Sequence, residues 1–291
     1  MIPREAAPSL IYLHSRIPAR HPSVAVLGEE RMGVGVAVEP RKVLTAHYLV
    51  MGAERIEVVG IDGRPRSVPR VGVDHESGLA LLTLEGAELR PARVAEAPGA
   101  APGLPVFLLT CVGPGQRKGA TGHVFSVGPF EAFWEYMLDR AIMTTAINPG
   151  LAGAPLFDGR GRLLGLVSLG LAAVARYSLA IPIELFLERR ALLDGEAGPE
   201  RQRAWIGFYP QANDGGLAIT GVVAGGPADT AGLQKGDFVL TVDGRSVTSL
   251  RELYRELWKK GVGERLGFQV LRDSAIHVVD VVAGDRRDFY K

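Results

Sequence analysis

Cysteine and long apolar runs are scarce in this sequence. Its 291 residues include one cysteine, Cys111, which excludes an internal disulfide and a cysteine-based zinc site. The longest apolar stretch, Leu163–Ala175, is well short of the roughly 20 residues that a membrane-spanning helix needs. Excess charge of one sign is also lacking, because 33 Lys and Arg stand against 32 Asp and Glu. We therefore expect no membrane span, and no basic face large enough to bind nucleic acid.

The first residues lack the apolar core of a secretory signal peptide. The segment Met1–Pro8 carries an acid and two prolines where such a leader has an apolar run. We therefore expect a cytoplasmic protein if Met1 is the natural start, and a periplasmic one if Met1 is an artificial boundary.

Short strand-like segments fill the sequence up to about residue 186. Gly, Pro and Asp separate them at close spacing, which is typical of all-β barrels and sandwiches. A polar stretch, Asp194–Arg203, leads into a mixed α+β half. There Ser249 and Glu252 form a capping box before apolar residues at helical spacing, which predicts a helix over Ser249–Lys260. The strands expected in the first half are Ser23–Leu27, Gly33–Val38, Val43–Thr45, Arg55–Val59, Leu79–Leu84, Val106–Leu109 and Leu163–Leu169.

Segments of the first half resemble the trypsin fold in its HtrA form. Gly33–Val50 is similar to the strand pair and turn that carry the family's catalytic histidine, and Val73–Leu82 to the segment of the catalytic aspartate. Thr145–Leu156 resembles the nucleophile loop, and Ser178–Pro182 the strand that borders the substrate cleft. The resemblance implies an all-β trypsin-like double β-barrel over residues 9–186.

The same resemblance locates the three catalytic positions. His47 matches the base, Gly78 stands at the position of the acid, and Ala152 stands at that of the nucleophile. Hydrolysis in this family needs a serine to attack, a histidine to take its proton and an aspartate to orient the imidazole. A glycine has no side chain, and a methyl group cannot attack a carbonyl. We therefore expect no active catalytic residue, a vestigial His47 and a pseudoprotease that is not an enzyme.

The nucleophile loop leaves two other interpretations of Ala152 open. One is an active serine-type endopeptidase with unconventional residues, and the other is an engineered serine-to-alanine form of one. An engineered change would not explain Gly78, nor Leu151 and Ala154, where the family pattern has a polar residue and a glycine. The backbone amides of Gly150, Leu151 and Ala152 are kept, so we hypothesise that this loop still accepts a carbonyl or a carboxylate.

Metal binding is the remaining chemical alternative. His47 and His75 lie on segments that meet at the cleft in this fold, and Glu76 is the next residue along. The six histidines show no local ligand spacing. We therefore expect no metal and no cofactor, and keep a His47–His75 site as the weaker alternative.

The second half resembles a PDZ domain. Arg203–Phe208 is similar to the carboxylate-binding loop of bacterial PDZ domains, and Gly225–Leu233 and Lys235–Gly244 follow in the usual order. This implies a small α+β PDZ domain over residues 203–286, after a linker at 187–202. The glycine of the loop lets backbone amides converge on the terminal carboxylate of a peptide. The expected peptide-binding residues are Trp205, Ile206, Gly207, Phe208, Leu253 and Leu257.

In such domains the ligand adds as a strand between the loop's own strand and the helix. We expect that strand to be only Gly207–Tyr209, because Pro210 offers no N–H to a ladder. The expected partners are peptides or protein C-termini. An active HtrA-family protease and further copies of this chain in a trimer are additional candidates, although nothing in Met1–His21 indicates self-association.

Overall fold

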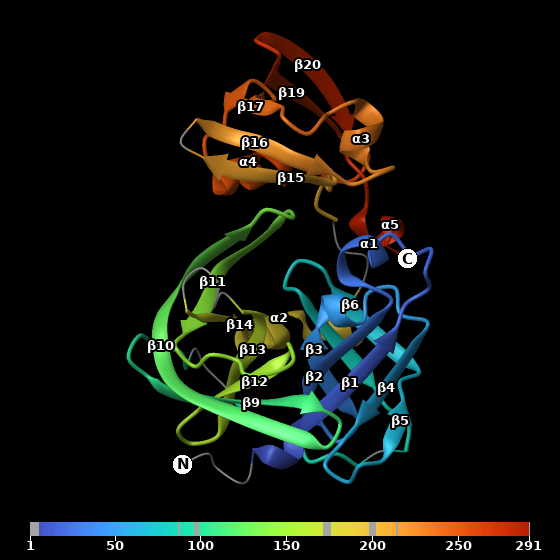
Figure 1. The fold of residues 1–291 in the computed structure, drawn as a ribbon, viewed down its shortest axis with the longest axis vertical. Coiled ribbons are helices and arrows are strands. Elements are labelled where there is room, and N and C mark those ends of the chain that lie inside the picture. The colour runs from blue at the N-terminus through green and yellow to red at the C-terminus, as the bar shows by residue number, and fades with distance from the viewer. Residues whose placement is uncertain are drawn as a thin grey trace. The chain divides into compact units, whose positions relative to one another are not determined.

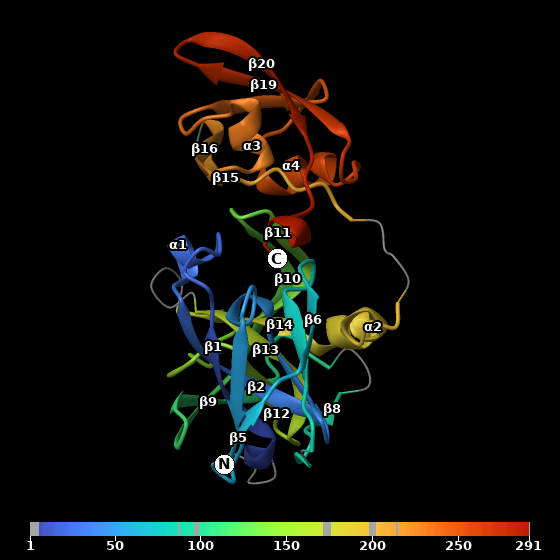
Figure 2. The same cartoon turned by 90° about the vertical axis from the view of Figure 1, so that its right-hand side faces the viewer.

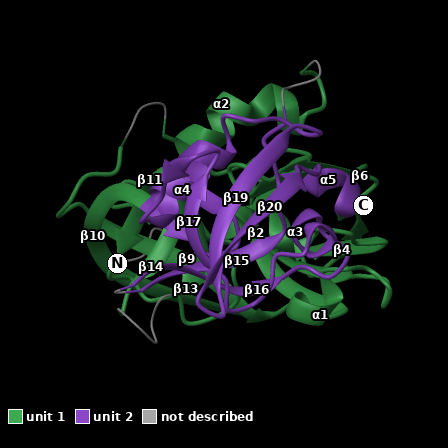
Figure 3. Ribbon diagram, turned by 90° about the horizontal axis from the view of Figure 1, so that it is seen from above, with its two compact units in different colours: residues 1–129, 139–198, 290–291 green, residues 130–138, 199–289 purple. Residues whose placement is uncertain are grey.

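The computed structural model describes residues 6–86, 88–95, 99–170, 176–197, 202–213 and 215–290. They form two compact units, coloured separately in Figure 3. Unit 1 comprises the described residues within 1–129, 139–198 and 290–291, and unit 2 those within 130–138 and 199–289. Residues 130–138, expected in the first domain, therefore belong to unit 2.

The first half of unit 1 is a seven-stranded antiparallel sheet (Figure 1). Its strand order is β5-β4-β1-β2-β3-β7-β6. Buried aliphatic residues line its inner face, from Ile11 and Leu13 on β1 to Leu82 on β7. The strands are β1 (Leu10–Arg16), β2 (Glu30–Glu39), β3 (Lys42–Ala46), β4 (Arg55–Val59), β5 (Pro65–Ser67), β6 (Arg70–Asp74) and β7 (Leu79–Thr83).

The second half of unit 1 is a sheet of seven strands in the order β12-β9-β10-β11-β14-β13-β8. Strand β12 pairs with both β9 and β13, which closes the sheet into a barrel and leaves few free edges. The strands are β8 (Arg93–Val94), β9 (Pro105–Gly113), β10 (Gln116–Ala132), β11 (Tyr136–Thr144), β12 (Ala154–Asp158), β13 (Arg162–Gly170) and β14 (Ser178–Pro182).

Short helices complete unit 1. Helix α2 packs alongside β6 and β13 (Figure 2). It occupies the first residues of the expected linker 187–202, and residues 198–201 of that linker lie outside the described residues. The helices are η1 (Ala7–Ser9), α1 (Val24–Leu27), η2 (His47–Leu49) and α2 (Ile183–Leu193).

The expected strand Ser23–Leu27 is wrong, because α1 occupies it. Its β-branched residues fit a strand by propensity, but Val26 is 73% exposed and gains nothing from a sheet face. A hydrogen bond from the Ser23 amide to the His21 ring starts the turn instead, and Gly28 ends it.

Unit 2 has a sheet in the order β15-β16-β17-β19-β20, with β18 paired to β17. Strand β15 was expected to end at Tyr209, and it instead continues past Pro210 to Asn213. The register shifts between Phe208 and Pro210, and β15 is an edge strand, which are two settings where proline is tolerated. The elements are β15 (Phe208–Asn213), β16 (Gly216–Val222), α3 (Pro227–Ala231), β17 (Phe238–Val242), β18 (Arg245–Ser246), α4 (Leu250–Leu257), β19 (Arg265–Arg272), β20 (Ala275–Val282) and α5 (Arg286–Phe289).

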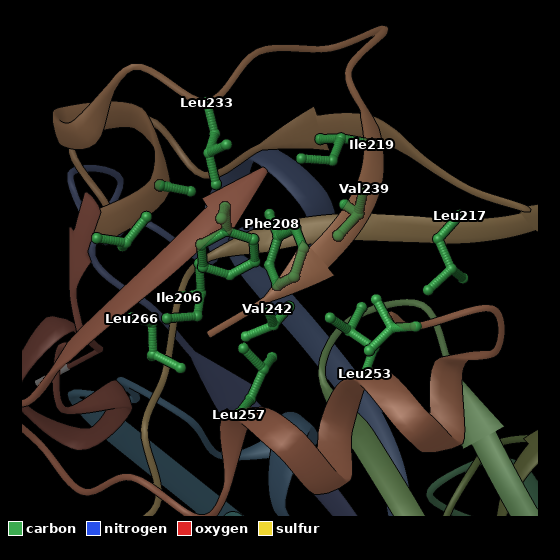
Figure 4. Close-up of a cluster of buried hydrophobic side chains, with 14 of the residues drawn as sticks. Ile206, Phe208, Leu217, Ile219, Leu233, Val239, Val242, Leu253, Leu257 and Leu266 are labelled. Atoms are coloured by element: carbon green, nitrogen blue, oxygen red, sulfur yellow. The ribbon is translucent and has the colours of Figure 1, made fainter. Parts of the chain in front are cut away.

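Helix α4 closes the core of unit 2. The Ser249 hydroxyl accepts the amide of Glu252, so the predicted N-cap is confirmed. Leu253 and Leu257 point from α4 into a buried cluster around Phe208 (Figure 4). Among the described residues, no helix is long and apolar enough to cross a bilayer.

Candidate catalytic cleft and carboxylate-binding loop

His47 begins the turn η2 directly after β3, as expected for the base position. Its backbone N–H donates to the carbonyl of Gly78 over 2.9 Å, which ties the two matched segments together. Its ring meets the ring of His75 edge-on, with centroids 5.1 Å apart. Two imidazoles and the backbone of position 78 therefore meet at one place in unit 1.

The segment that leads to position 78 is held by its own acids. The buried carboxylate of Asp74 accepts the amides of Glu76 and Ser77, over 3.0 and 3.2 Å. The carboxylate of Glu76 pairs with Arg189 of α2 at 2.9 Å. Asp74 therefore stabilises the turn, and Glu76 is committed to a cation on a neighbouring helix.

The backbone at Gly78 has a φ of +78°. An L-residue in this left-handed region costs roughly 1–2 kcal/mol, least for Asn and Asp. Glycine therefore suits the turn conformation itself, a reason for its presence that has nothing to do with catalysis.

The nucleophile loop uses two of its amides within the chain. The Gly150 N–H donates to Oδ1 of Asn148 at 3.1 Å, and the Leu151 N–H donates to the carbonyl of Cys111 at 2.9 Å. Nδ2 of Asn148 donates back to the carbonyl of Leu151 at 2.9 Å. The carbonyl of Ala152 accepts the amide of Val34 over 2.8 Å. The hypothesis that this loop accepts an external carbonyl therefore requires the Gly150 amide to leave Asn148.

The residues of the weaker metal alternative do not form a ligand set with a third group. In the parts of the chain that the structure describes, no three His, Cys, Asp or Glu side chains gather as metal ligands. Cys111 is buried, and this burial raises the pKa of its thiol, against the opposing charge of Arg117. Buried in this way, it packs as a small apolar side chain.

The carboxylate-binding loop of unit 2 holds a carboxylate, that of Glu135. Its Oε1 accepts the amides of Gly207 at 2.7 Å and Phe208 at 3.3 Å, and its Oε2 accepts the amide of Ile206 at 3.0 Å. The φ of +77° at Gly207 turns consecutive amides toward one point. Three consecutive N–H groups therefore act together as an anion-binding nest.

Glu135 is only 4% exposed. Burial raises the pKa of its carboxyl above the ordinary value, while the charge of Arg286 and the three loop amides act against this rise. Arg286 also donates to the backbone carbonyls of Trp134 and Glu135, over 2.8 and 3.3 Å. The acid is therefore fully enclosed within unit 2, with a cation nearby.

The side chains named for peptide binding lie mainly in the core of unit 2. Ile206, Phe208, Leu253 and Leu257 are each at most 1% exposed. The ring of Trp205 lies 4.7 Å from that of Phe289 and lines a pocket of about 490 Å³ with Pro227 and Val282. The loop therefore offers its backbone amides, rather than these side chains, for polar contacts.

The sequence analysis did not identify Glu135 as the group that contacts this loop. It lies in Phe130–Leu138, the tip of the hairpin formed by β10 and β11, about 70 positions before the loop that binds it. An aromatic cluster was the available signal, because the tip carries Phe130, Phe133, Trp134 and Tyr136. Aromatic side chains at a hairpin tip gain most when they pack against another surface.

Comparisons with known families agree with this geometry. The trypsin-like peptidase domain family matches residues 33–166, and the PDZ domain family matches residues 204–282. A probable periplasmic DegP-like serine endoprotease of Halomonas elongata is 27% identical over 284 residues, covering 90% of this chain and 59% of that protein. A probable periplasmic serine protease of Haemophilus influenzae, described as do/HhoA-like, is 28% identical over 270 residues, covering 85% and 57%.

This chain is similar to the trypsin-like peptidase and PDZ domain families and to DegP-like serine endoproteases. It spans a little over half the length of these curated relatives. The HtrA-type protease AlgW with a decapeptide matches this chain with a TM-score of 0.58, 22% identity and 97% of each chain covered. The serine endoprotease from Yersinia pestis matches with a TM-score of 0.59, 24% identity, and 97% and 96% covered. At these identities the structures establish the fold, a mostly β trypsin-like domain followed by a PDZ domain.

The expectation that this protein is not an enzyme is contradicted. Its curated relatives are named serine endoproteases, and its structural neighbours are proteases of the HtrA type. The expectation compared three side-chain positions. The absence of a side chain at a matched position shows only that this position supplies no catalytic group. It does not test whether another residue supplies one.

The names of the curated relatives also bear on location. They are described as periplasmic, which fits the periplasmic alternative rather than the cytoplasmic one.

Proposed function

We propose that this protein recognises peptides through the carboxylate-binding loop of unit 2, with the C-terminal carboxylate as the recognised group. The observation that supports this is the convergence of three amides, from residues 206, 207 and 208, on one carboxylate. Charge-assisted hydrogen bonds of this kind are roughly twice as strong as neutral ones. A nest that binds the carboxylate of a side chain has the chemistry to bind that of a chain end.

Binding of paired peptides to the full chain tests this proposal. Each fluorescein-labelled decapeptide ends in an apolar residue, once as the free acid and once as the C-terminal amide. We expect free acids to bind at least about tenfold more tightly than their amides, because the amide has no negative charge for the nest. Equal binding of the two forms across the set would overturn the proposal.

A second candidate function is endopeptidase activity on unfolded protein. The names of the curated relatives favour it, and the placement of His47 beside His75 supplies an imidazole at the cleft. Ala152 has only a methyl group and Gly78 no side chain, so hydrolysis must take its nucleophile from elsewhere. A water deprotonated by His47 is the general-base route that this cleft offers.

An unfolded casein substrate tests the second candidate. We expect cleavage by the wild type that falls at least about a hundredfold in His47→Ala, the range of general-base contributions. A matched control is His123→Ala, because His123 lies on β10 and its ring contacts the Thr145 hydroxyl. Cleavage equal in wild type and His47→Ala, or absent from both, would overturn this candidate.

We also propose that this protein works in the periplasm. The support is the description of its curated relatives as periplasmic. Assembly into trimers and pairing with an active protease of the family stay predictions.

A further inference from the structure

The tip of the β10–β11 hairpin, residues 130–138, contacts both sides of the expected peptide groove of unit 2. On the loop side, the carboxylate of Glu135 accepts hydrogen bonds from the amides of residues 206–208. On the helix side, the hydroxyl of Tyr254 on α4 donates to the carbonyl of Ala132 at 2.5 Å and accepts the amide of Glu135 at 3.1 Å. The tip therefore holds the carboxylate site and the helical wall at once.

Two further contacts strengthen this attachment. Glu131 pairs with Arg251, also on α4. Met137 packs, partly buried, against the apolar core of unit 2. The tip thus brings a carboxylate to the loop and an apolar side chain to the core of unit 2.

The backbone at Glu135 indicates that these contacts fix its conformation. Its φ is +54°, in the left-handed region that a residue other than glycine rarely adopts. Such a conformation persists where the surroundings over-determine it. Here the surroundings are three amides on the side chain, Tyr254 on the backbone N–H and Arg286 on the backbone carbonyl.

We propose that Glu135 is an internal ligand of the carboxylate-binding loop, and that an incoming carboxylate must displace it. The inference rests on the proposed peptide recognition and adds its regulation. One nest cannot give the same three N–H groups to two carboxylates. The observed affinity for a peptide is therefore lower than the intrinsic affinity, by the fraction of molecules in which Glu135 has left the loop.

The test compares Glu135→Ala with the wild-type full chain, using the free-acid decapeptides described above. We expect Glu135→Ala to bind them at least about tenfold more tightly, because the loop is open in every molecule. Glu135→Gln keeps the size of the side chain, loses its charge and is expected to gain less. The matched control is Asp139→Asn, an exposed acid on β11, which is expected to bind as the wild type does.

Amide hydrogen exchange gives a readout that needs no peptide. The amides of Ile206, Gly207 and Phe208 are expected to exchange slowly in the wild type and in Asp139→Asn, and faster in Glu135→Ala. Equal exchange at these amides in wild type and Glu135→Ala would overturn the inference.

Peptide binding separates failure of this inference from failure of the proposed function. Equal affinity for free acids in wild type and Glu135→Ala would overturn the internal ligand and leave peptide recognition standing. If no peptide bound to any variant, including Glu135→Ala, the proposed peptide recognition would be overturned. The proposed competition between Glu135 and the peptide carboxylate would be overturned with it.

Discussion

Two glycine-containing loops of this protein present backbone amides, and they use them differently. In unit 2 the amides of residues 206–208 converge on the carboxylate of Glu135. In unit 1 the amide of Gly150 donates to Asn148 and that of Leu151 to the carbonyl of Cys111. The first loop holds an anion, whereas the second satisfies these two donors locally. A glycine permits an anion-binding turn, but the neighbouring acceptors decide whether the amides face a ligand.

Substitution of Gly207 should produce the largest effect. Gly207→Ala places a Cβ at positive φ and 3.0 Å from the Trp205 ring, so we expect a loss of about 1–2 kcal/mol in the free energy of unfolding. Free-acid peptides should also bind at least about tenfold more weakly, because the nest is distorted. Denaturant titration and peptide binding measure the two effects.

The control for this change is Gly263→Ala. Gly263 also has a positive φ, +81°, but a Cβ there meets nothing within 4 Å. It should lose a similar part of the unfolding free energy and keep the peptide affinity of the wild type. If both variants lost affinity equally, the loop would not be the recognition site.

Removal of the Asn148 side chain frees the Gly150 amide from its local acceptor, so that this amide of the unit 1 loop becomes available to a ligand. Asn148→Ala deletes the acceptor of the Gly150 amide and the donor to the Leu151 carbonyl. We expect a loss of about 1–2 kcal/mol in unfolding free energy. Amide hydrogen exchange should be faster at Gly150. It should stay slow at Leu151, because the Leu151 amide still donates to the carbonyl of Cys111.

Asn213→Ala is the matched control, because Asn213 forms the same kind of turn at an exposed position, with the amide of Gly215. Asn213→Ala should lower the free energy of unfolding by less than about 0.5 kcal/mol. An unchanged Gly150 exchange rate in Asn148→Ala would contradict the assignment of this loop.

Weakening the hairpin attachment without touching the nest should have a smaller effect. Glu131 and Arg251 are each about a quarter exposed, so their ion pair is worth about 0.2–1 kcal/mol. Glu131→Gln should therefore raise the affinity for free-acid peptides about two- to threefold. Glu256→Gln, which removes an acid of α4 that pairs with Lys259, should leave it unchanged. If Glu131→Gln raised the peptide affinity as much as Glu135→Ala does, the ion pair rather than the bound carboxylate would limit access to the loop.

The dependence of peptide affinity on pH should be the smallest effect. Because the pKa of docked Glu135 is raised, the docked tip binds a proton more readily than the released tip. Docking is therefore favoured below the ordinary pKa of the glutamate carboxyl and loses this advantage as the pH rises through the raised pKa. The charged and titratable groups around the acid are Arg286, Tyr254 and Tyr209, and none of them has an ordinary pKa between 5 and 8.

The peptide affinity of the wild type should accordingly rise as the pH is raised from below the ordinary glutamate pKa through the raised one, as measured by fluorescence anisotropy. Glu135→Gln has no titrating group at this position and should show no such rise. The opposite slope in the wild type would contradict the assigned direction of the pKa.

Local sequence patterns predicted part of the fold. The capping box at Ser249 and Glu252 predicted α4, because its hydrogen bonds and its apolar spacing are confined to one helix. The strand-like segments predicted a β-rich first half for the same reason. Ser23–Leu27 failed, since a strand also needs a neighbour to pair with, and propensity does not supply one.

The candidate site was only partly predictable. The glycine of the unit 2 loop and the histidine of η2 lie within recognisable strings of residues. Glu135, which occupies the loop, could not be found in this way. Residues 130–138 are far from the loop in sequence and carry no recognisable motif that pairs them with it.

By itself, the order of residues determined a β-rich domain, a PDZ domain after it, and a turn at Gly207 with amides able to converge. Those properties depend on neighbours within a few positions of the chain. The tertiary structure decided that Glu135 occupies one loop and that Asn148 and Cys111 satisfy the other. Hydrogen-bond partners of this kind are chosen by distance in space, which only the folded chain defines.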